Sequence, residues 1–451
     1  MEQTGSVNAD PAQLPVGRYT RWRNWSAFWI LGLCNNFSYV VMLSAAHDIL
    51  KKQESQQNAT QTSSAEVSVG WNSSNSSRYD CNPISTAAVL VADILPTLVL
   101  KIFAPFFIHK MPYGFRVLFC VVMGMMSFLL VSFSTAVWFS IIGVISASIS
   151  SGLGELSFLS LTVFFSRDMV GGWSSGTGGA GVAGSFLYSG LTQVGLSPRV
   201  TLLIMLVVPV AMLVSYFFLL AAPPSLPQWR SREREYTAVT SEERQGLMDQ
   251  SEQEEWDKAH PGAQFTRAEF VPSGSEVISS GPLTFSEKLV VIRGLLKFTI
   301  PLSLVYFAEY FINQGLMELL YFPNFFLSHS EQYRWYQTLY QVGVLLSRSS
   351  LCCVKIRKLW VLSGLQLVNA ILLLFAVRFL FLPSAWLVFA IVLYEGLLGG
   401  AAYVNAFYFI SKESEDRHRE FAMAAASVAD SLGIAVAALA SFPAHRYFCS
   451  L

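Results

Sequence analysis

The stretch 301–322 carries side chains that an apolar segment of its length does not ordinarily contain. About 20 apolar residues suffice to cross a bilayer, and this stretch is long enough to do so. Its middle and second half nevertheless contain Glu309, Asn313, Gln314 and Glu318. Helical spacing places Glu309 and Asn313 on one side with Tyr306, and it places Glu318 beside them with Tyr310. A carboxylate at mid-bilayer costs at least ~2.5–3.5 kcal/mol, so these groups must face other helices or water. They indicate a polar solute, a coupling proton or a buried structural network.

Other apolar stretches contain similar polar groups. Arg334, Gln337 and Gln341 share one helical face, and tyrosines lie beside them. A guanidinium can bind a phosphate in a bidentate way, and aromatic faces attract a quaternary ammonium. The alternative is internal ion pairing that holds helices together, such as Asp93 with Lys101 or Glu318 with Arg334. Lys101 and Arg348, near helix ends, could simply extend toward the membrane surface. The remaining polar groups within apolar stretches are Asn35, Asn36, Glu155, Glu395, Asn405 and Asp430.

The composition predicts a protein with many membrane spans. Of the 451 residues, 53% are hydrophobic and only 13% are charged, whereas soluble chains are about 25% charged. The net charge of zero says nothing about nucleic acid, but no basic domain stands out, so we expect no nucleic-acid partner. The G-x-G-x-x-G pattern at 176–181 lies inside an apolar stretch instead of after a strand, so it does not predict a dinucleotide site. No G-x-S-x-G nucleophile elbow occurs, because the match at 172–176 lies inside an apolar stretch and follows no strand. No H-E-x-x-H motif occurs, and the six cysteines form no metal-type pair. We therefore expect no enzyme, no cofactor and no metal, and most cysteines as buried thiols.

Apolar periodicity predicts an all-α polytopic fold with about eleven transmembrane helices. The predicted segments are 25–46, 84–107, 116–134, 137–165, 172–194, 200–222, 295–322, 332–351, 359–378, 385–410 and 420–442. The chain then divides into a cytoplasmic tail (1–24), a six-helix bundle (25–222), a linker (223–290), a five-helix bundle (291–443) and a C-terminal tail (444–451). The polar loop 51–83 contains three N-glycosylation sequons, at Asn58, Asn72 and Asn75. These sequons predict a lumenal or extracellular loop.

The distribution of charge predicts the orientation of the chain. Basic residues are concentrated in the loops on the side opposite the sequons, which places the N-terminus in the cytosol. An odd number of helices then places the C-terminus in the lumen. The linker 223–290 is acidic, polar and poor in apolar residues, as disordered segments are. Within it, Glu243, Leu247 and Met248 fit an acidic dileucine-type motif read by sorting adaptors, although a chance match is an equal alternative. The motif predicts a lysosomal or endosomal address.

Small residues recur at every fourth position in the fifth and eleventh predicted segments. The two stripes are Gly172, Gly176, Ala180 and Gly184, and Ala425, Ala429, Gly433 and Ala437. Such stripes let helices approach closely where hydrophobicity gives no drive for association. The residues 165–168 end the fourth segment as 410–413 end the tenth, and each follows a glycine-rich helix. Corresponding elements in corresponding order predict two parallel pseudo-repeats (6+5) around an axis along the membrane normal. The alternative is that membrane helices are in general rich in small residues.

Four stretches of the chain closely resemble the battenin family of lysosomal membrane proteins. They are 31–48, 173–181, 306–315 and 394–405, and the similarity spans nearly every helix. The resemblance implies a major-facilitator-like fold in late endosomes and lysosomes, and a role in clearing glycerophosphodiesters such as glycerophosphocholine. Other roles that it implies are lysosomal pH homeostasis, autophagy, arginine transport and the trafficking of Golgi and endosomal carriers.

We therefore expect a carrier that exports small phosphodiesters from lumen to cytosol by alternating access. Arg334 would bind the phosphodiester, with Lys101 as a second candidate, and Tyr306 or Tyr310 would pack on choline. The glycerol hydroxyls would bond to Gln337, Gln341, Asn35, Asn36, Asn313 and Asn405. Glu309 or Glu155 would carry a coupling proton, with further relay candidates at Asp93, Glu318, Glu395 and Asp430. The small-residue stripes would form the moving surfaces between helices. The alternatives are a scaffold that sorts cargo, and a carrier of basic amino acids or nucleosides.

Overall fold

The computed structural model describes residues 18–62, 86–134, 137–224, 226–229 and 283–450, and every regular element among them is a helix. The first half comprises α1 (Arg18–Thr62), α2 (Thr86–Phe103), α3 (Tyr113–Ser132), α4 (Val137–Leu161) and α5 (Asp168–Gln193). It ends with the consecutive helices α6 (Pro198–Ile204), α7 (Val207–Val214) and a π-helical turn, η4 (Ser215–Leu219). Short 3-10 turns follow α2 and α4, at η1 (Ala104–Phe106), η2 (Ile108–Lys110) and η3 (Thr162–Phe164).

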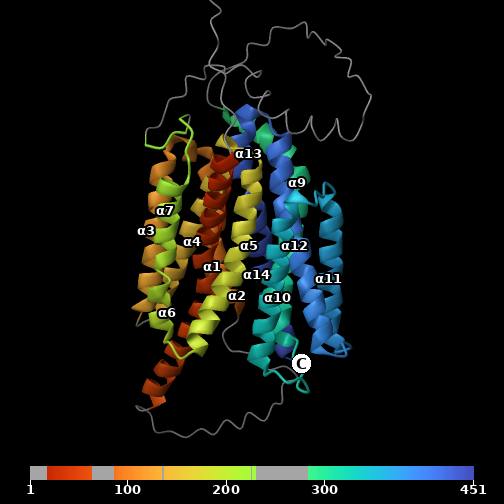
Figure 1. Cartoon of the computed structure of the whole chain (residues 1–451). Coiled ribbons are helices and arrows are strands. Elements are labelled where there is room, and N and C mark those ends of the chain that lie inside the picture. Colours follow the sequence, from red (N-terminus) through yellow and green to blue (C-terminus); the bar gives the residue numbers. More distant parts are fainter. Residues whose placement is uncertain (1–17, 63–85, 135–136, 225, 230–282, 451) are drawn as a thin grey trace, which may run out of the picture.

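The second half begins with α9 (Phe285–Phe311), which continues into a π-helical turn, η5 (Ile312–Leu316), and a 3-10 turn, η6 (Met317–Leu319). It continues with α10 (His329–Ser349), η7 (Ser350–Cys352), α11 (Leu359–Phe379) and α12 (Ala385–Glu413). The last two helices, α13 (Asp416–Ala426) and α14 (Val428–Cys449), are separated only at Ser427. The long helices run roughly side by side, and the C-terminus lies at the end opposite α13 and the start of α9 (Figure 1).

Each of the eleven predicted segments overlaps one helix or a run of consecutive helices. By length and apolar composition, seven helical stretches among the described residues qualify as membrane spans. These are Tyr113–Ser132, Trp138–Phe164, Pro198–Leu219, Phe285–Leu319, Leu359–Phe379, Ala385–Glu413 and Asp416–Cys449. The four remaining long helices, α1, α2, α5 and α10, lie among the buried helices of the bundle. α1 and α10 are polar and α5 is rich in glycine, so composition alone underestimates these three helices, whereas α2 is apolar. The all-helical polytopic fold is confirmed, and the count of eleven spans stays a prediction.

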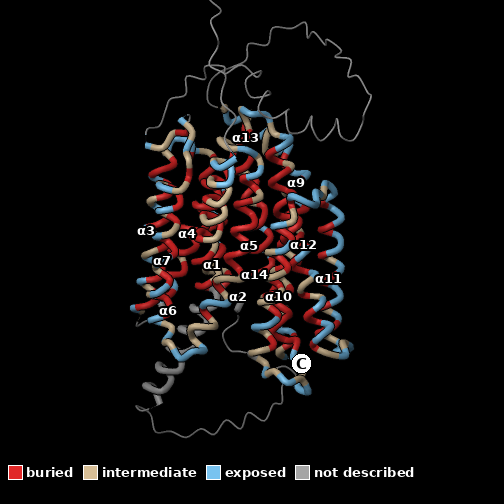
Figure 2. Tube along the Cα trace, viewed as in Figure 1, coloured by how far each residue is buried: buried red, intermediate tan, exposed pale blue. Residues whose placement is uncertain are grey.

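The distribution of polar and apolar side chains is the reverse of that in a soluble protein. Figure 2 shows a buried centre and an exposed rim. Charged side chains such as Lys101, Glu155 and Glu395 are buried, whereas large apolar side chains such as Phe119 of α3 and Phe375 of α11 are exposed. Lipid solvates an apolar exterior, and it cannot hydrogen-bond to polar groups. The chain is therefore built to stand in a bilayer.

The two halves use the same contacts between equivalent helices. In the first half, a Cβ atom on Gly176 of α5 would collide with the backbone carbonyl of Trp29 in α1. In the second half, a Cβ atom on Gly433 of α14 would collide with the backbone carbonyl of Ser303 in α9. Across the boundary between the halves, α5 packs on α10 as α2 packs on α14. These matched contacts agree with two parallel repeats.

A second pair of contacts fixes the register of the repeat. The Asn35 Oδ1 atom of α1 lies against Gly154 of α4, and the Glu309 Oε2 atom of α9 lies against Gly399 of α12. Asn35 lies six residues after Trp29, and Glu309 likewise lies six residues after Ser303. Trp29 and Ser303 are the residues whose carbonyls touch Gly176 and Gly433. Asn35 and Glu309 therefore occupy equivalent positions in the two halves.

The other residues of the two stripes are mostly buried in the same interfaces. Gly172 lies against Trp25 of α1, and Gly184 lies against Val40 of the same helix. Ala180, Ala429 and Ala437 are buried, and Ala425 is half-buried in α13, before the break at Ser427. Whether these surfaces move against one another stays a prediction.

Several local features differ from the expected boundaries. α1 begins at Arg18 and continues to Thr62, so helix extends into both the predicted tail and the predicted loop 51–83. α9 begins at Phe285, before the predicted end of the linker at 290, because Thr284 and Glu287 form a capping box. Of the cysteines, Cys34 and Cys120 are buried thiols, the adjacent Cys352 and Cys353 are exposed thiols, and Cys449 is disulfide-bonded. The expectation of mostly buried thiols was therefore wrong for these three residues, of which Cys352 and Cys353 lie in the turn after α10.

We predict that the Gly433→Ala substitution destabilises the protein by about 1–3 kcal/mol, because backbone atoms of α9 must shift to admit the new methyl group. Gly364→Ala in α11 is the matched control, since a Cβ atom there meets nothing within 4 Å. Both substitutions bring the same gain in helix propensity. Thermal unfolding in detergent should show a lower midpoint for Gly433→Ala alone. Equal midpoints for the two variants would contradict the close approach of α14 and α9.

Candidate functional site

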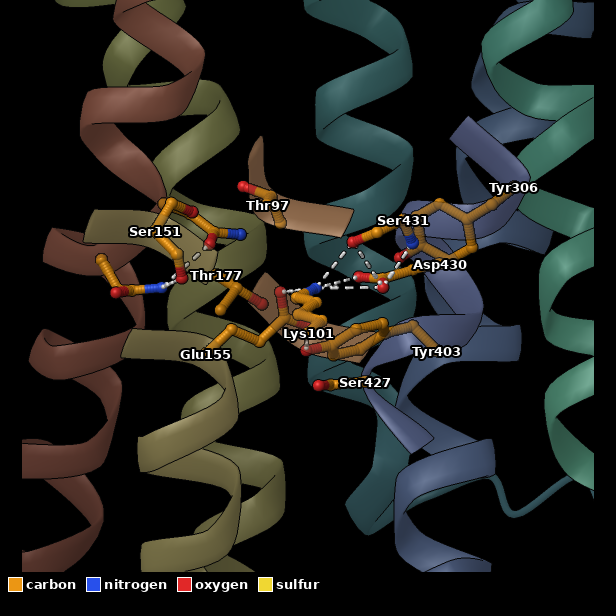
Figure 3. Close-up of polar contacts among 12 residues, drawn as sticks. Thr97, Lys101, Ser151, Glu155, Thr177, Tyr306, Tyr403, Ser427, Asp430 and Ser431 are labelled. Carbon is orange, nitrogen blue, oxygen red and sulfur yellow. Dashed lines mark hydrogen bonds and ion pairs between the residues drawn. The ribbon is translucent and has the colours of Figure 1, made fainter. Parts of the chain in front are cut away.

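A buried lysine lies at the boundary between the two halves. Lys101 of α2 is 1% exposed, and its ammonium lies 2.7 Å from Glu155 Oε2 of α4 and 3.1 Å from Asp430 Oδ1 of α14. It also donates a hydrogen bond to the Ser431 hydroxyl at 2.9 Å. Figure 3 shows the ammonium between the two carboxylates, one from each half. A buried charge is tolerated only where it is paired, and here the pairing joins the halves.

The break between α13 and α14 explains the position of Asp430. Ser427 ends α13, and its hydroxyl bonds to the Ala424 carbonyl at 2.8 Å. Asp430 therefore falls in the first turn of α14, where the helix dipole favours a negative charge. Its Oδ1 atom accepts a hydrogen bond from the backbone N–H of Ser431 at 2.6 Å. Discontinuous helices whose N-terminal ends face the centre of the bilayer are a recurring feature of transporter binding sites.

An arginine lies close to this lysine cluster. Arg348 of α10 is 8% exposed, and it donates hydrogen bonds to the Thr177 hydroxyl of α5 at 2.5 Å and to the Tyr306 hydroxyl of α9 at 2.8 Å. Its guanidinium carbon lies 4.1 Å from the ring centroid of Tyr403 in α12, a cation–π distance. The Tyr403 hydroxyl donates to Glu155 Oε1 at 2.8 Å. Tyr403 thus connects the arginine to the lysine cluster.

These residues form what we call the central cluster: Lys101, Glu155, Thr177, Tyr306, Arg348, Tyr403 and Asp430. They come from α2, α4 and α5 of the first half and from α9, α10, α12 and α14 of the second. Two cations and two carboxylates balance one another in charge. Because each cation is held by side chains of both halves, an anion that enters here would compete with protein groups for the same donors.

The predicted residues Tyr306, Tyr310 and Lys101 all lie in or beside the central cluster. Tyr310 stacks on Tyr306 with ring centroids 6.2 Å apart. Lys101 does not pair with Asp93, and neither it nor Arg348 extends to the surface, so these two alternatives from the sequence were wrong. Asp93 is fully buried, and neither of its carboxylate oxygens has a hydrogen-bond partner among the described residues.

Arg334 lies elsewhere. It is exposed near the start of α10, fourteen residues before Arg348, which corresponds to ~21 Å along a helix that rises 1.5 Å per residue. Gln337 and Gln341 follow it on α10 and are half-buried. The Gln337 Nε2 atom lies 3.4 Å from the Asn313 carbonyl, and the Gln341 side chain occupies the space beside Gly181 of α5. This face of α10 therefore leads from the end of the bundle toward its centre.

The predicted amides are mostly occupied by contacts between helices. Asn35 donates to the Ser151 carbonyl of α4 at 3.0 Å, and Asn36 lies beside it and is half-buried. Asn405 accepts from the backbone N–H of Ile356 at 2.7 Å and donates to the Ala401 carbonyl, so it holds the turn before α11. Neither contact places these amides in the central cluster.

A second set of predicted residues gathers inside the second half. Glu309 of α9 and Glu395 of α12 are 1% and 0% exposed, and Asn313 is 2% exposed. Asn313 Nδ2 donates to Glu395 Oε1 at 3.1 Å, and the hydroxyl of Tyr340 donates to Glu309 Oε1. Glu318 is buried farther along this segment, where its backbone carbonyl accepts from His329 Nε2 at 2.8 Å.

Several predictions lie outside the described residues. These are the sequons at Asn72 and Asn75 and the sorting motif at Glu243, Leu247 and Met248, while Asn58 falls in the last part of α1, whose side chains are not described. Conversely, the sequence analysis assigned no role to Thr177 or Tyr403, considered Tyr340 only as one of the tyrosines beside Arg334, Gln337 and Gln341, and undervalued Arg348. A clue for Tyr403 was its spacing from Glu395, eight residues or about two helical turns, which puts both on one face of α12.

Comparisons with known proteins agree with this architecture. The family model described as CLN3 protein matches residues 26–451. The chain is 53% identical to Battenin of Canis lupus familiaris, over 95% of this chain and 92% of that protein. It is 38% identical to Protein BTN1 of Yarrowia lipolytica, over 94% of each chain. Among solved structures, the human organic anion transporter MFSD10 (TETRAN) aligns with a TM-score of 0.51 at 15% identity, covering 95% of this chain and 94% of that one. At this level of identity, the last similarity shows a shared fold.

We predict that Lys101→Met destabilises the protein by about 3–5 kcal/mol, because Glu155 and Asp430 are then buried without a cation. Lys297→Met is the control, since Lys297 pairs with Glu413 at the surface and should contribute at most ~1 kcal/mol. Unfolding in mixed micelles measures both. Adding Glu155→Gln and Asp430→Asn to Lys101→Met should restore part of the loss. Similar losses for the two lysine variants would show that the central ion pairs do not stabilise the fold.

Proposed function

The chain belongs to the CLN3 protein family and has the fold of a membrane transporter, and from this premise we propose that it exports glycerophosphodiesters. The substrate class is represented by glycerophosphocholine, and the direction is from the lumen of lysosomes and late endosomes to the cytosol. Export would support lysosomal pH homeostasis and autophagy by removing the end products of phospholipid breakdown.

The observation that supports this proposal is the pair of buried cations on either side of Tyr403. A phosphodiester carries one negative charge, and a guanidinium holds a phosphate through two parallel hydrogen bonds. Arg348 now uses its two Nη atoms on neutral hydroxyls, those of Thr177 and Tyr306. A phosphodiester is a stronger acceptor than either hydroxyl, so it would replace them. We therefore assign the phosphate to Arg348, with Lys101 beside it.

The aromatic residues of the cluster suit the other end of the substrate. Tyr306 and Tyr310 are stacked, and Tyr306 meets Tyr403 edge to face with centroids 6.3 Å apart. Aromatic faces bind a quaternary ammonium through cation–π attraction. Choline would occupy this aromatic corner, close to the phosphate at Arg348.

Alternating access would exchange the contacts that join the halves. Lys101 bonds to Asp430, Tyr403 bonds to Glu155, and Arg348 bonds to Thr177, each across the boundary. When a substrate anion takes the donors, these bonds are released and the halves can rock. Arg334, Gln337 and Gln341 would then line the path by which the substrate reaches the centre along α10.

The orientation follows from charge and redox chemistry. Cys449 at the end of α14 is disulfide-bonded, and disulfides persist in oxidising compartments such as the secretory lumen. The end of the bundle that carries α13 and the start of α9 would face the cytosol, where sorting adaptors could read Glu243, Leu247 and Met248. A lumenal C-terminus agrees with a cytoplasmic N-terminus and with the positive-inside bias of the loops.

We predict that purified protein in liposomes takes up labelled glycerophosphocholine, and that Arg348→Gln lowers the uptake by roughly 10- to 100-fold. The reason is the loss of charge-assisted hydrogen bonds, each of which contributes about 1.5–3 kcal/mol. Arg378→Gln is the matched control, because Arg378 lies in the last turn of α11 and is not part of the central cluster. This variant should transport normally. Arg334→Ala should have a smaller effect if that residue only lines the path.

The same uptake assay also defines the results that would contradict the proposed function. Wild-type liposomes that show no uptake would leave the scaffold as the better reading. Free arginine or a nucleoside could suppress the uptake at a lower concentration than unlabelled glycerophosphocholine does. That result would show that the carrier instead transports basic amino acids or nucleosides. Deleting residues 230–280 should leave uptake unchanged, since that segment contributes no residue to the central cluster.

A further inference from the structure

Two buried carboxyl groups of the second half form no ion pair with any cation in the described part of the chain. Glu309 bonds only to the Tyr340 hydroxyl, and Glu395 bonds only to the Asn313 amide, among the described residues. Glu155 and Asp430, by contrast, share the ammonium of Lys101. The two glutamates therefore differ from the carboxylates of the central cluster in lacking a counter-charge within bonding distance.

Three buried oxygen atoms of this group also lack any partner in the described part of the chain. They are Glu309 Oε2, Glu395 Oε2 and Asn313 Oδ1. A buried polar oxygen without a hydrogen bond is costly, and an isolated buried carboxylate is far more costly. Because none of the three side chains is more than 2% exposed, bulk water does not pair with them. The group calls for a positively charged ligand that the chain itself does not supply.

The backbone brings these oxygens to one place. Asn313 lies in the π-helical turn of 312–316, one turn after Glu309, and its Nδ2 atom donates both to the Glu309 carbonyl at 3.0 Å and to Glu395 at 3.1 Å. Such wide turns are frequent at functional sites. Across the interface, the Glu309 carboxylate lies against Gly399, one turn after Glu395 on α12. A side chain at 399 would fill the space that the carboxylate occupies.

The charged and titratable groups around the pair are few. α10 contributes Tyr340 and Arg348, and α9 itself contributes Tyr306 and Tyr310. α14 contributes Asp430, which is held by Lys101. The one charged residue of α11, Arg378, lies in the last turn of that helix. Arg348 is directed to the Tyr306 hydroxyl, one turn from Glu309, so it acts on the glutamates from a distance without bonding to either.

We propose that Glu309 and Glu395, bridged by Asn313, bind a single proton that the carrier moves together with its substrate. The inference rests on the proposed export function and identifies its coupling ion. A proton on one carboxyl turns one of the three unpaired oxygens into a donor, which can bond to a second of them. The equivalent position in the first half is the amide of Asn35, which cannot titrate. One half thus holds the proton site.

The connection to the central cluster passes through Tyr306. With both glutamates charged, their negative potential acts on Arg348 across one helical turn and opposes the entry of an anion. Adding one proton reduces that negative potential and leaves the guanidinium available to the phosphodiester. Proton and anion therefore bind cooperatively, as symport from an acidic lumen requires.

The test uses the full-length protein in liposomes and compares two kinds of flux of labelled glycerophosphocholine. In the first, exchange against unlabelled internal substrate at equal pH reports binding and rocking. In the second, net accumulation under an inward proton gradient reports coupling. Glu309→Gln and Glu395→Gln should each lower gradient-driven accumulation by at least ~10-fold while exchange persists. The melting temperature in detergent shows which variants are folded.

Glu331→Gln is the matched control. Glu331 lies in the first turn of α10, and glutamine preserves its capping box, so both fluxes should equal those of the wild type. Asp93→Asn tests a further buried carboxyl, whose two oxygens have no hydrogen-bond partner among the described residues. Loss of gradient-driven accumulation in Asp93→Asn, with retention in the two glutamate variants, would overturn the assignment to Glu309 and Glu395.

Failure of the inference is distinguishable from failure of the proposed function. No exchange by the wild type overturns both. Exchange without response to the proton gradient overturns the coupling and leaves the carrier intact. Accumulation that follows a sodium gradient at constant pH overturns the proton in favour of Na⁺. Accumulation retained in Glu309→Gln and Glu395→Gln overturns the site.

Discussion

The arrangement of the two halves depends on how one buried ammonium is neutralised. Lys101 lies where water does not reach, so its charge must be compensated by protein groups. One compensating carboxylate comes from its own half, and the other stands at the start of a helix in the opposite half. The ion pairs of Lys101 therefore join the two halves through contacts that are both electrostatic and directional. Every other feature of the centre, from the break at Ser427 to the ring of Tyr403, serves to place groups around this charge.

Such ion pairs between the halves would suit the proposed carrier, which would alternate between two conformations. Apolar contacts between the halves would be non-directional. Because lipid is as apolar as the side chains, the hydrophobic effect would not favour contact between the halves over separation. Ion pairs and charge-assisted hydrogen bonds can be exchanged one for another when a substrate brings its own charges. The close backbone contacts within each half, at Gly176 and Gly433, have the opposite character, because nothing in the substrate replaces them. The structure therefore combines ion pairs and hydrogen bonds between the halves with close backbone contacts within them.

The sequence predicted the fold well because bilayer thickness and apolar composition restrict the possible elements so strongly. Apolar segments, small-residue stripes and matched motifs predicted helices in two parallel repeats. The site was predicted less well. Arg334 and Arg348 occur on one helix with similar neighbours, and only the packing of α10 against α5 and α9 shows that Arg348 is central. Likewise, Asp430 is one acidic residue among many until the break at Ser427 places it at a helix start. Helical spacing shows which residues share a face, and it does not show which face meets which neighbour.

The positions of Asn35 and Glu309 have a consequence for how such proteins diversify. The two halves have equivalent positions that each lie beside a glycine. Asn35, an amide, occupies one of them, and Glu309, an acid, occupies the other. An amide and an acid of similar size fit the same space, so exchanging them leaves the architecture intact. Under the proton coupling proposed above, single side chains at these two positions would set the ion stoichiometry, and proteins with zero, one or two titratable residues there could share one backbone.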